Sequence, residues 1–427
     1  MPKLQKLKNG LTLLSAPIAG AKTAAVLVMI ATGSKHEDRT TSGLSHFLEH
    51  MFFKGTVKRP NAQLISSTLD RVGGEYNAFT SKEYTGYWVK TASSDLPLAI
   101  DVVADMLLGS KFDAEEIDRE KGVIIEEVNM YLDNPLMRIG DVFEECLYGD
   151  TPAGWDTIGT KDNIRGFQRA DFVKYFKSQY RASNSFVCLA GDLPKDAKKL
   201  VEKHFSAWSK GKPKAKLPTA DKQSKPSVKV EYKKTDQAHL SLGVRSEAYN
   251  GKDEFIVKLI ATALGGSMSS RLFHSLRERN GLCYYVRTGA ETYTDTGYIT
   301  TQAGVPVDKV EKAIGIILAE YKRLSTELMD KDELKKIKQF VSGRILLQLE
   351  GADDVANWYA HQLVLNCQQP GGARRKLVTP NDFLSKVKKI TAEDIRRVAK
   401  TIFDPKRLNL AIIGPYKSGD AFLKLLK

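Results

Sequence analysis

Residues 43–56 read GLSHFLEHMFFKGT and carry two histidines four positions apart, with a glutamate directly before the second. Positions i and i+4 of a helix lie one above the other, so the side chains of His46 and His50 can close on one metal ion. Glu49 borders the same face, three residues after His46, where it can reach a water molecule beside the metal. These are the ligands and base of a zinc hydrolase, in the reverse order of the commoner H-E-x-x-H motif.

The residues around this motif predict a helix that is mostly buried. Ser42 suits the N-cap of such a helix, and Gly55 suits its end. Most positions between the polar residues are apolar: Leu44, Phe47, Leu48, Met51 and Phe52. Polar groups on a largely buried helix need partners. This context favours a metal site over a pair of solvated histidines.

A catalytic zinc ion takes three protein ligands and keeps one position open for water. Residues 112–135 (FDAEEIDREKGVIIEEVNMYLDNP) predict one long helix that carries the candidates for the third ligand, Glu126 and Glu127. Glu127 lies two turns after Glu120 on the same face, whereas Glu126 has Arg119 in that relation. A face with two glutamates suits a cation better than one with an arginine, but a solvated acidic face is an equal alternative. The helix alone leaves the choice open.

The chain resembles the pitrilysin/insulinase-type zinc metallopeptidases, or inverzincins, and within them the branch of the β-subunit of mitochondrial processing peptidase. The similarity runs essentially from end to end. It is clearest in four stretches: GSKHED (33–38), GLSHFLEHMFFKGT (43–56), GGEYNAFTSKEYT (73–85) and EEIDREKGVIIEEV (115–128). The family has H-x-x-E-H, then roughly 75 residues, then a glutamate ligand preceded seven positions earlier by another acidic residue.

This spacing implies the roles of the site residues. In this chain 76 residues separate His50 from Glu127, and Glu120 stands seven positions before Glu127. The resemblance therefore implies that His46, His50 and Glu127 bind one Zn²⁺ per chain. It implies Glu49 as the general base, and Glu120 as a residue that orients the site.

Two further sets of residues follow from the resemblance. Residues 269–299 resemble the family's second-domain signature, which implies that Arg277 and Tyr284 contact the substrate or transition state, with Arg279 as a nearby alternative. A guanidinium and a phenol can both donate hydrogen bonds to a developing oxyanion. In the family, the substrate joins a sheet edge as an added strand, although an ordinary paired strand is an equal alternative here. That edge corresponds to Asn77, Ala78 and Phe79.

An internal repeat divides the chain. Both halves end in a short apolar strand followed by a glycine turn, at 184–194 (NSFVCLAGDLP) and 407–417 (RLNLAIIGPYK). EEIDREKG at 115–122 also aligns with DELKKIKQ at 332–339, at an offset of 217 positions. That offset carries Glu127 onto Arg344, and no second H-x-x-E-H exists in the sequence. The second half is therefore predicted to keep the scaffold without the metal site.

The predicted fold is α+β, with two homologous domains related by this duplication. Each domain is expected to be a largely antiparallel sheet covered on one face by helices. The predicted boundaries are a zinc-binding catalytic domain at 1–210, a Lys/Pro/Ser-rich linker at 211–228, and a metal-free domain at 229–427 that contributes substrate contacts.

Composition argues against several other classes of function. The net charge of +14 comes from dispersed lysines without a dense basic and aromatic block, so no nucleic-acid partner is predicted. No apolar run reaches the length of a membrane span, so no membrane partner is predicted. The four cysteines are scattered, and KLKNGLTLLSAP (6–17), which resembles the family's first strand, leaves no room for a removable leader. The expected compartment is therefore the reducing cytoplasm.

These patterns together predict a zinc endopeptidase that acts on peptides or unfolded polypeptides. The zinc motif and the Arg277/Tyr284 signature occur on one chain, which predicts a self-sufficient homodimer, with a heteromeric partner as the alternative. Sedimentation of a fully active monomer would contradict the dimer. The rival function is a non-catalytic structural or partner subunit of a processing-peptidase-like complex. Such subunits typically lose metal-site residues, whereas this chain keeps all four.

Overall fold

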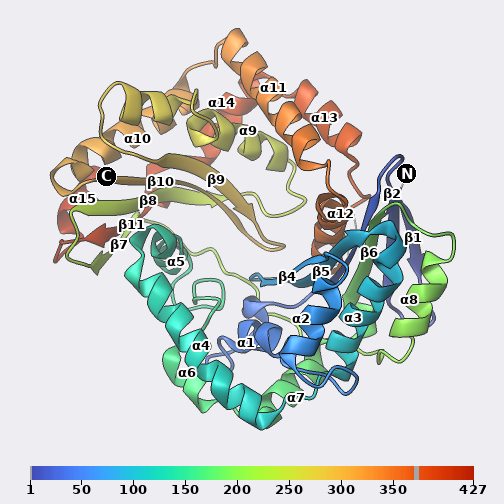
Figure 1. The fold of residues 1–427 in the computed structure, drawn as a ribbon. Coiled ribbons are helices and arrows are strands. Elements are labelled where there is room, and N and C mark those ends of the chain that lie inside the picture. Colours follow the sequence, from blue (N-terminus) through green and yellow to red (C-terminus); the bar gives the residue numbers. More distant parts are fainter. Residues whose placement is uncertain (1, 370–374) are drawn as a thin grey trace. The chain divides into compact units, whose positions relative to one another are not determined.

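The computed structural model describes residues 2–369 and 375–427, which form two compact units. Each unit is built around one sheet (Figure 1). Unit 1 takes the described residues of Met1–Asn129, Asp156–Leu217 and Leu347–Leu377. Unit 2 takes Met130–Trp155, Pro218–Leu346 and Val378–Lys427.

The sheet of unit 1 has six strands, and all neighbours are antiparallel except β2 and β6. In sheet order the strands are β1 (Lys3–Lys6), β2 (Thr12–Pro17), β6 (Ser185–Gly191), β3 (Thr23–Ile30), β5 (Thr85–Ala92) and β4 (Glu75–Thr80). The helices of this unit are α1 (Leu44–Met51), α2 (Ala62–Asp70), α3 (Leu96–Gly109), most of α4 (Ala114–Asp133), α6 (Lys161–Gly166), α7 (Arg169–Gln179), α8 (Ala197–Phe205) and α12 (Ala352–Cys367).

The sheet of unit 2 has five strands, and only β7 and β11 are parallel. In sheet order they are β7 (Ser227–Tyr232), β11 (Asn409–Gly414), β8 (Gln237–Ser246), β10 (Gly297–Pro306) and β9 (Val286–Thr292). The helices are α5 (Pro135–Tyr148), α9 (Glu254–Gly265), α10 (Val310–Thr326), most of α11 (Lys331–Gln348), α13 (Pro380–Lys389), α14 (Ala392–Ile402) and α15 (Asp420–Leu425).

The two sheets repeat one topology. Read from the parallel pair outward, β2-β6-β3-β5-β4 and β7-β11-β8-β10-β9 have the same order of parallel and antiparallel neighbours. The offset of 217 positions also carries the start of α4 onto that of α11, and the start of α5 onto that of α12. The prediction of two homologous α+β domains with largely antiparallel sheets is confirmed.

The expectation that helices cover only one face of each sheet is wrong. Side chains alternate between the two faces of a strand. In β3, Ala24, Val26 and Val28 join the core that α1, α3 and α7 also enter, yet Ala25 and Leu27 on the opposite face are equally buried. The helix that packs most extensively on β3 and β6, besides their neighbouring strands, is α12. The apolar part of β3, residues 24–30, is therefore buried on both faces of the sheet.

The packing units cross the midpoint of the sequence. Helix α12 comes from the second half of the sequence but belongs to unit 1, and its repeat equivalent α5 comes from the first half but belongs to unit 2. In unit 2, α5 packs on β11, β8 and β7. The predicted domain boundaries (1–210, 211–228 and 229–427) therefore describe the sequence repeat and stay a prediction. The packed units differ from them, because each unit includes one helix from the other half of the sequence.

No helix in the described part of the chain is both long enough and apolar enough to cross a bilayer.

Candidate metal centre

Helix α1 is held at its start by a buried carboxylate. Gly43 has a left-handed backbone, with φ of 96°, and a Cβ there would lie 2.6 Å from the carbonyl oxygen of Ile158. Glu37 accepts hydrogen bonds from the backbone N–H groups of Gly43 (2.9 Å) and Ser45 (2.6 Å). Ser42, the predicted N-cap, does not cap the helix, because Gly43 occupies that position and Glu37 satisfies the first N–H groups.

The apolar side of α1 is anchored in the core of unit 1. Phe47, Leu48 and Met51 are buried, and the Phe47 ring packs edge-on against Phe172 with ring centroids 4.8 Å apart. The helix ends at Met51, before the predicted end at Gly55. This anchoring fixes the orientation of the opposite side, which carries the two histidines.

The loop before α1 contains a second buried titratable group. His36 is nearly fully buried, and its Nδ1 accepts a hydrogen bond from the backbone N–H of Gly33 at 3.2 Å. Burial lowers the pKa of His36 from its ordinary value of 6.5 to about 4. The neutral ring is therefore part of the folded loop.

We expect acid to destabilise the fold through His36. Below pH 6.5 the unfolded chain binds this proton and the folded chain does not, so the free energy of unfolding falls as the pH drops towards 4. The part of the free energy of unfolding that His36 contributes should fall by about 2 kcal/mol between pH 7 and pH 5. The raised pKa of Glu37, about 7, acts in the opposite direction, so the His36 part is measured as the difference between the original protein and a variant without His36, by urea unfolding of zinc-free protein. A His36→Gln variant should lack this part of the pH dependence. An equal pH dependence in the two proteins would contradict the assignment.

Three side chains from α1 and α4 converge in unit 1. His46 Nε2 lies 3.6 Å from one oxygen of Glu127, and His50 Nε2 lies 3.5 Å from the other. One ligand atom from each of the three residues can be chosen so that all lie within 4.8 Å of one another. In the described part of the chain, this is the one group of three or more His, Cys, Asp or Glu residues with such geometry.

The donor set and its spacing fit a zinc ion. Tetrahedral zinc with ligands at 2.0–2.1 Å requires ligand atoms about 3.3 Å apart, close to both histidine–glutamate distances. Two imidazoles and one carboxylate are the ligands of many catalytic zinc sites, and the three side chains here are partly exposed, so a water could enter. His46, His50 and Glu127 are thus the residues that would hold the metal.

The structure also separates the two neighbouring glutamates of α4. Glu127 faces the histidines, whereas Glu126 is exposed to solvent and lies outside the cluster. Burial would raise the pKa of Glu127, but the neighbouring imidazoles of His46 and His50 hold that pKa below its ordinary value. The carboxylate is therefore ionised and ready to bind a cation.

Glu120 orients the second histidine from behind. Its Oε1 lies 2.8 Å from His50 Nδ1, which leaves His50 Nε2 to face Glu127. Lys54 contacts the other oxygen of Glu120 at 2.5 Å. Despite burial, the bonds to His50 and Lys54 keep the pKa of Glu120 below its ordinary value. A carboxylate behind a metal-binding histidine fixes the tautomer and the ring orientation.

Glu49, the predicted base, is held by the strand that carries the predicted substrate edge. Thr80 Oγ1, at the end of β4, donates a hydrogen bond of 2.5 Å to Glu49 Oε2. Burial raises the pKa of Glu49, an effect that the Thr80 bond and the two histidines partly oppose. Thr80, Lys54 and Glu37 were not predicted as site residues. Of these, only Lys54 had a local signal, since it lies one turn after His50.

The predicted substrate edge lies on β4. This strand ends the sheet of unit 1 and pairs only with β5 among the described strands. Asn77 is exposed, Ala78 and Phe79 are partly exposed, and the Asn77 side chain accepts a hydrogen bond from the Ala78 N–H at 2.8 Å. An edge strand offers backbone groups that no neighbouring strand pairs. Strand β4 is therefore suitable for pairing with an extended substrate, and that pairing stays a prediction.

Arg277 and Tyr284 meet in unit 2. Arg277 lies on a π-helical turn (Phe273–Glu278), and its guanidinium carbon is 5.3 Å from the centroid of the Tyr284 ring and 4.8 Å from that of Phe273. Tyr284 is 80% exposed. Arg277, rather than Arg279, is thus the arginine stacked on this tyrosine. The contact of this pair with substrate stays a prediction.

Comparisons with known proteins place the chain in a family. The model described as insulinase (peptidase family M16) matches residues 13–161, and that described as peptidase M16 inactive domain matches residues 166–341. An uncharacterized zinc protease of Streptomyces coelicolor is 32% identical, covering 97% of this chain and 90% of that protein. Another such protease, from Bacillus subtilis, is 32% identical over 97% of this chain and 98% of its own.

The fold agrees with these matches. The crystal structure of a protease from Helicobacter pylori superposes with a TM-score of 0.90 at 26% identity, over 97% of this chain and 99% of that one. The chain belongs to the M16 family of peptidases. The resemblance to pitrilysin/insulinase-type zinc peptidases is confirmed.

Proposed function

We propose that this chain is a zinc-dependent endopeptidase that cleaves peptides or unfolded polypeptides bound in extended form. The observation that carries the proposal is the convergence of His46, His50 and Glu127, with the half-buried carboxyl group of Glu49 on the same helix as the histidines. The names of the relatives, zinc proteases, support this class of reaction.

The protein's own residues supply proton transfer and orientation. When bound by the three ligands, zinc supplies a Lewis acid that lowers the pKa of a water molecule and polarises a carbonyl. Glu49 accepts a proton from the attacking water and delivers it to the leaving amine. The raised pKa of Glu49 moves it towards neutral pH, where one carboxyl group can both take up and release a proton.

The edge strand β4 suits an extended substrate. Backbone hydrogen bonds to an added strand give affinity without regard to most side chains, so a broad cleavage preference is expected. Thr80 is the last residue of β4 and also donates a hydrogen bond to Glu49. The same strand would therefore position both the peptide and the base. The proposal therefore assigns Asn77, Ala78 and Phe79 to peptide binding.

A direct test measures cleavage of fluorescence-quenched casein by the purified chain, with and without a chelator. Cleavage should disappear with the chelator and return when zinc is added back, with one zinc bound per chain. Cleavage that survives complete removal of the metal would refute the proposal. Zinc binding without cleavage of any peptide would favour the rival function, a non-catalytic partner subunit.

A second test concerns Thr80. A Thr80→Val variant should lower kcat about tenfold and leave zinc content unchanged, because Glu49 loses the bond that orients it. Thr80→Ser should restore most of the rate, since serine keeps the hydroxyl. Thr68→Val on α2, where the hydroxyl bonds to a backbone carbonyl instead, serves as the control. Equal rates for the Thr80→Val variant and the original protein would show that Glu49 needs no such support.

A further inference from the structure

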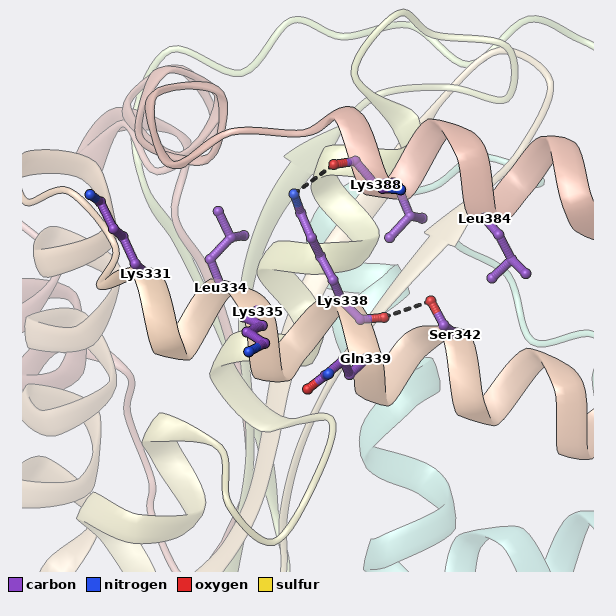
Figure 2. Close-up of a pocket in the computed structure, with 9 residues that line it drawn as sticks. Lys331, Leu334, Lys335, Lys338, Gln339, Ser342, Leu384 and Lys388 are labelled. Carbon is purple, nitrogen blue, oxygen red and sulfur yellow. Dashed lines mark hydrogen bonds between the residues drawn. The ribbon is translucent and has the colours of Figure 1, made fainter.

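A groove lies between helices α11 and α13 of unit 2. Its volume is about 640 Å³, and every residue that lines it comes from one of these two helices (Figure 2). A site with two helical walls is a trough open along one side. The lining residues are Lys331, Leu334, Lys335, Lys338, Gln339, Ser342, Leu384, Val387 and Lys388.

The charge of this groove is of one sign. Four of its lining residues are lysines, and none is acidic. Two acidic residues near these helices pair with other side chains. Glu333 of α11 forms a two-bond pair with Arg271, and Asp394 bonds to Thr391 and Arg397. The groove is therefore left with a net positive field.

The side-chain ammonium group of Lys338 lies inside the groove. Its Nζ reaches across from α11 and donates a hydrogen bond of 2.9 Å to the backbone carbonyl of Lys388, in the last turn of α13 (Figure 2). Burial lowers the pKa of Lys338, with Asp394 partly opposing that effect. An acidic group placed in the groove would give this ammonium the full charge partner that it lacks.

The groove also has an apolar floor. Leu334 of α11 and Leu384 of α13 line it and are partly exposed, and the buried Val387 of α13 also lines it. Helical periodicity places Leu346 on the same face of α11 as Lys335 and Ser342, and Leu346 is 60% exposed. The face of α11 therefore changes from basic to apolar towards its C-terminal end. Its ligand should carry acidic and apolar groups together.

We propose that this groove binds an acidic amphipathic helix of another protein. The apolar ridge of that helix would lie on Leu334 and Leu384, and its flanking carboxylates would pair with the four lysines. A third helix is the natural filler of a trough between two helices, because its ridges enter their groove. Helix α11 has 18 residues and so offers about 27 Å of length, enough for such a partner.

Nucleic acid fits the groove less well. The lining contains neither an arginine nor an aromatic ring, which are the groups that grip phosphates and stack on bases. The apolar floor would have no partner on a phosphate backbone. The proposed groove involves none of the candidate zinc residues, so it stands whether or not the chain cleaves peptides.

The test uses a fluorescein-labelled 18-residue helical peptide with leucines on one face and glutamates on both flanks. Anisotropy is measured with the full chain carrying Glu49→Gln, so that cleavage of the probe is suppressed. The double variant Lys335→Glu/Lys388→Glu should bind the peptide at least about tenfold more weakly. Lys312→Glu/Lys322→Glu on α10 makes the same charge change at exposed positions away from the groove and should leave binding unchanged.

Other outcomes would overturn the proposal. Equal weakening by the two double variants would assign binding to net charge alone. A peptide with serines in place of the leucines that binds as tightly would exclude the apolar floor. Displacement of the probe by single-stranded DNA, with that DNA bound more tightly than the peptide, would make the groove a nucleic-acid site.

One further outcome would support the proposal. A Leu384→Asn variant should bind the peptide more weakly while its circular dichroism spectrum shows an intact fold.

Discussion

Replacement of Glu49 by glutamine is expected to lower kcat for peptide cleavage about 1,000-fold while the zinc content stays unchanged. Glutamine has nearly the same shape and can still accept the hydrogen bond from Thr80, but it cannot take a proton from water. The measurement pairs metal analysis of the purified protein with the rate of cleavage of a quenched peptide.

The matched control is Glu126→Gln on α4. It makes the same chemical change at an exposed glutamate outside the cluster and should leave both zinc and rate unchanged. A Glu49→Gln variant with full activity would remove Glu49 from the mechanism. Loss of zinc in that variant would instead make Glu49 part of the metal site.

Replacement of Glu127 by glutamine is expected to weaken zinc binding by more than about 100-fold, a larger loss than removal of an outer partner causes. Glu127 is the acidic residue that faces both histidines, and a neutral amide lacks the charge that draws a dication. Activity should fall with zinc occupancy and recover in part at high zinc concentration. Competition with a chromogenic chelator measures the affinity.

Glu126→Gln is again the control, because the two positions are adjacent on one helix and carry the same side chain. Equal zinc affinity in the Glu127→Gln variant and the original protein would mean that the third ligand lies elsewhere. Weakening by Glu126→Gln alone would reverse the assignment of the two glutamates.

The convergence of His46, His50 and Glu127 could be predicted from the sequence to a large extent. The spacing of His46 and His50 is a property of helical geometry, and both helices that meet at the site were predicted from their sequence patterns. The choice between Glu126 and Glu127 was different. Helical spacing gave only a preference, and it took the family pattern, and then the fold, to bring Glu127 to the histidines.

The residues that hold the site in place were harder to predict from the sequence, because their contacts depend on tertiary packing. Thr80 lies 31 positions from Glu49, on a strand, and no local pattern links the two. Glu37 bonds to the first N–H groups of α1 across a loop, whereas the local sequence favoured Ser42, the small polar residue next to the helix. Long-range contacts of this kind follow from how a sheet and a helix pack, and they leave no periodic trace in the chain.

The prediction that helices cover only one face of each sheet was wrong for a related reason. The apolar sequence of β3 is typical of a strand buried on both faces, and burial on both faces requires a second covering layer. That layer is α12, more than 300 positions after β3 begins, which no reading of neighbouring residues could assign.

The reciprocal placement of α5 and α12 makes the two halves of the polypeptide mutually dependent. A fragment ending at residue 210 would contain every proposed zinc ligand, yet it would expose Ala25, Leu27 and Met29 to water for want of α12. A fragment beginning at residue 229 would lack α5 over β11 in the same way. Neither half is thus a self-contained building block. A protein cleaved between the two halves should stay folded only while the two fragments remain associated, because each fragment supplies a helix that packs on the sheet of the other.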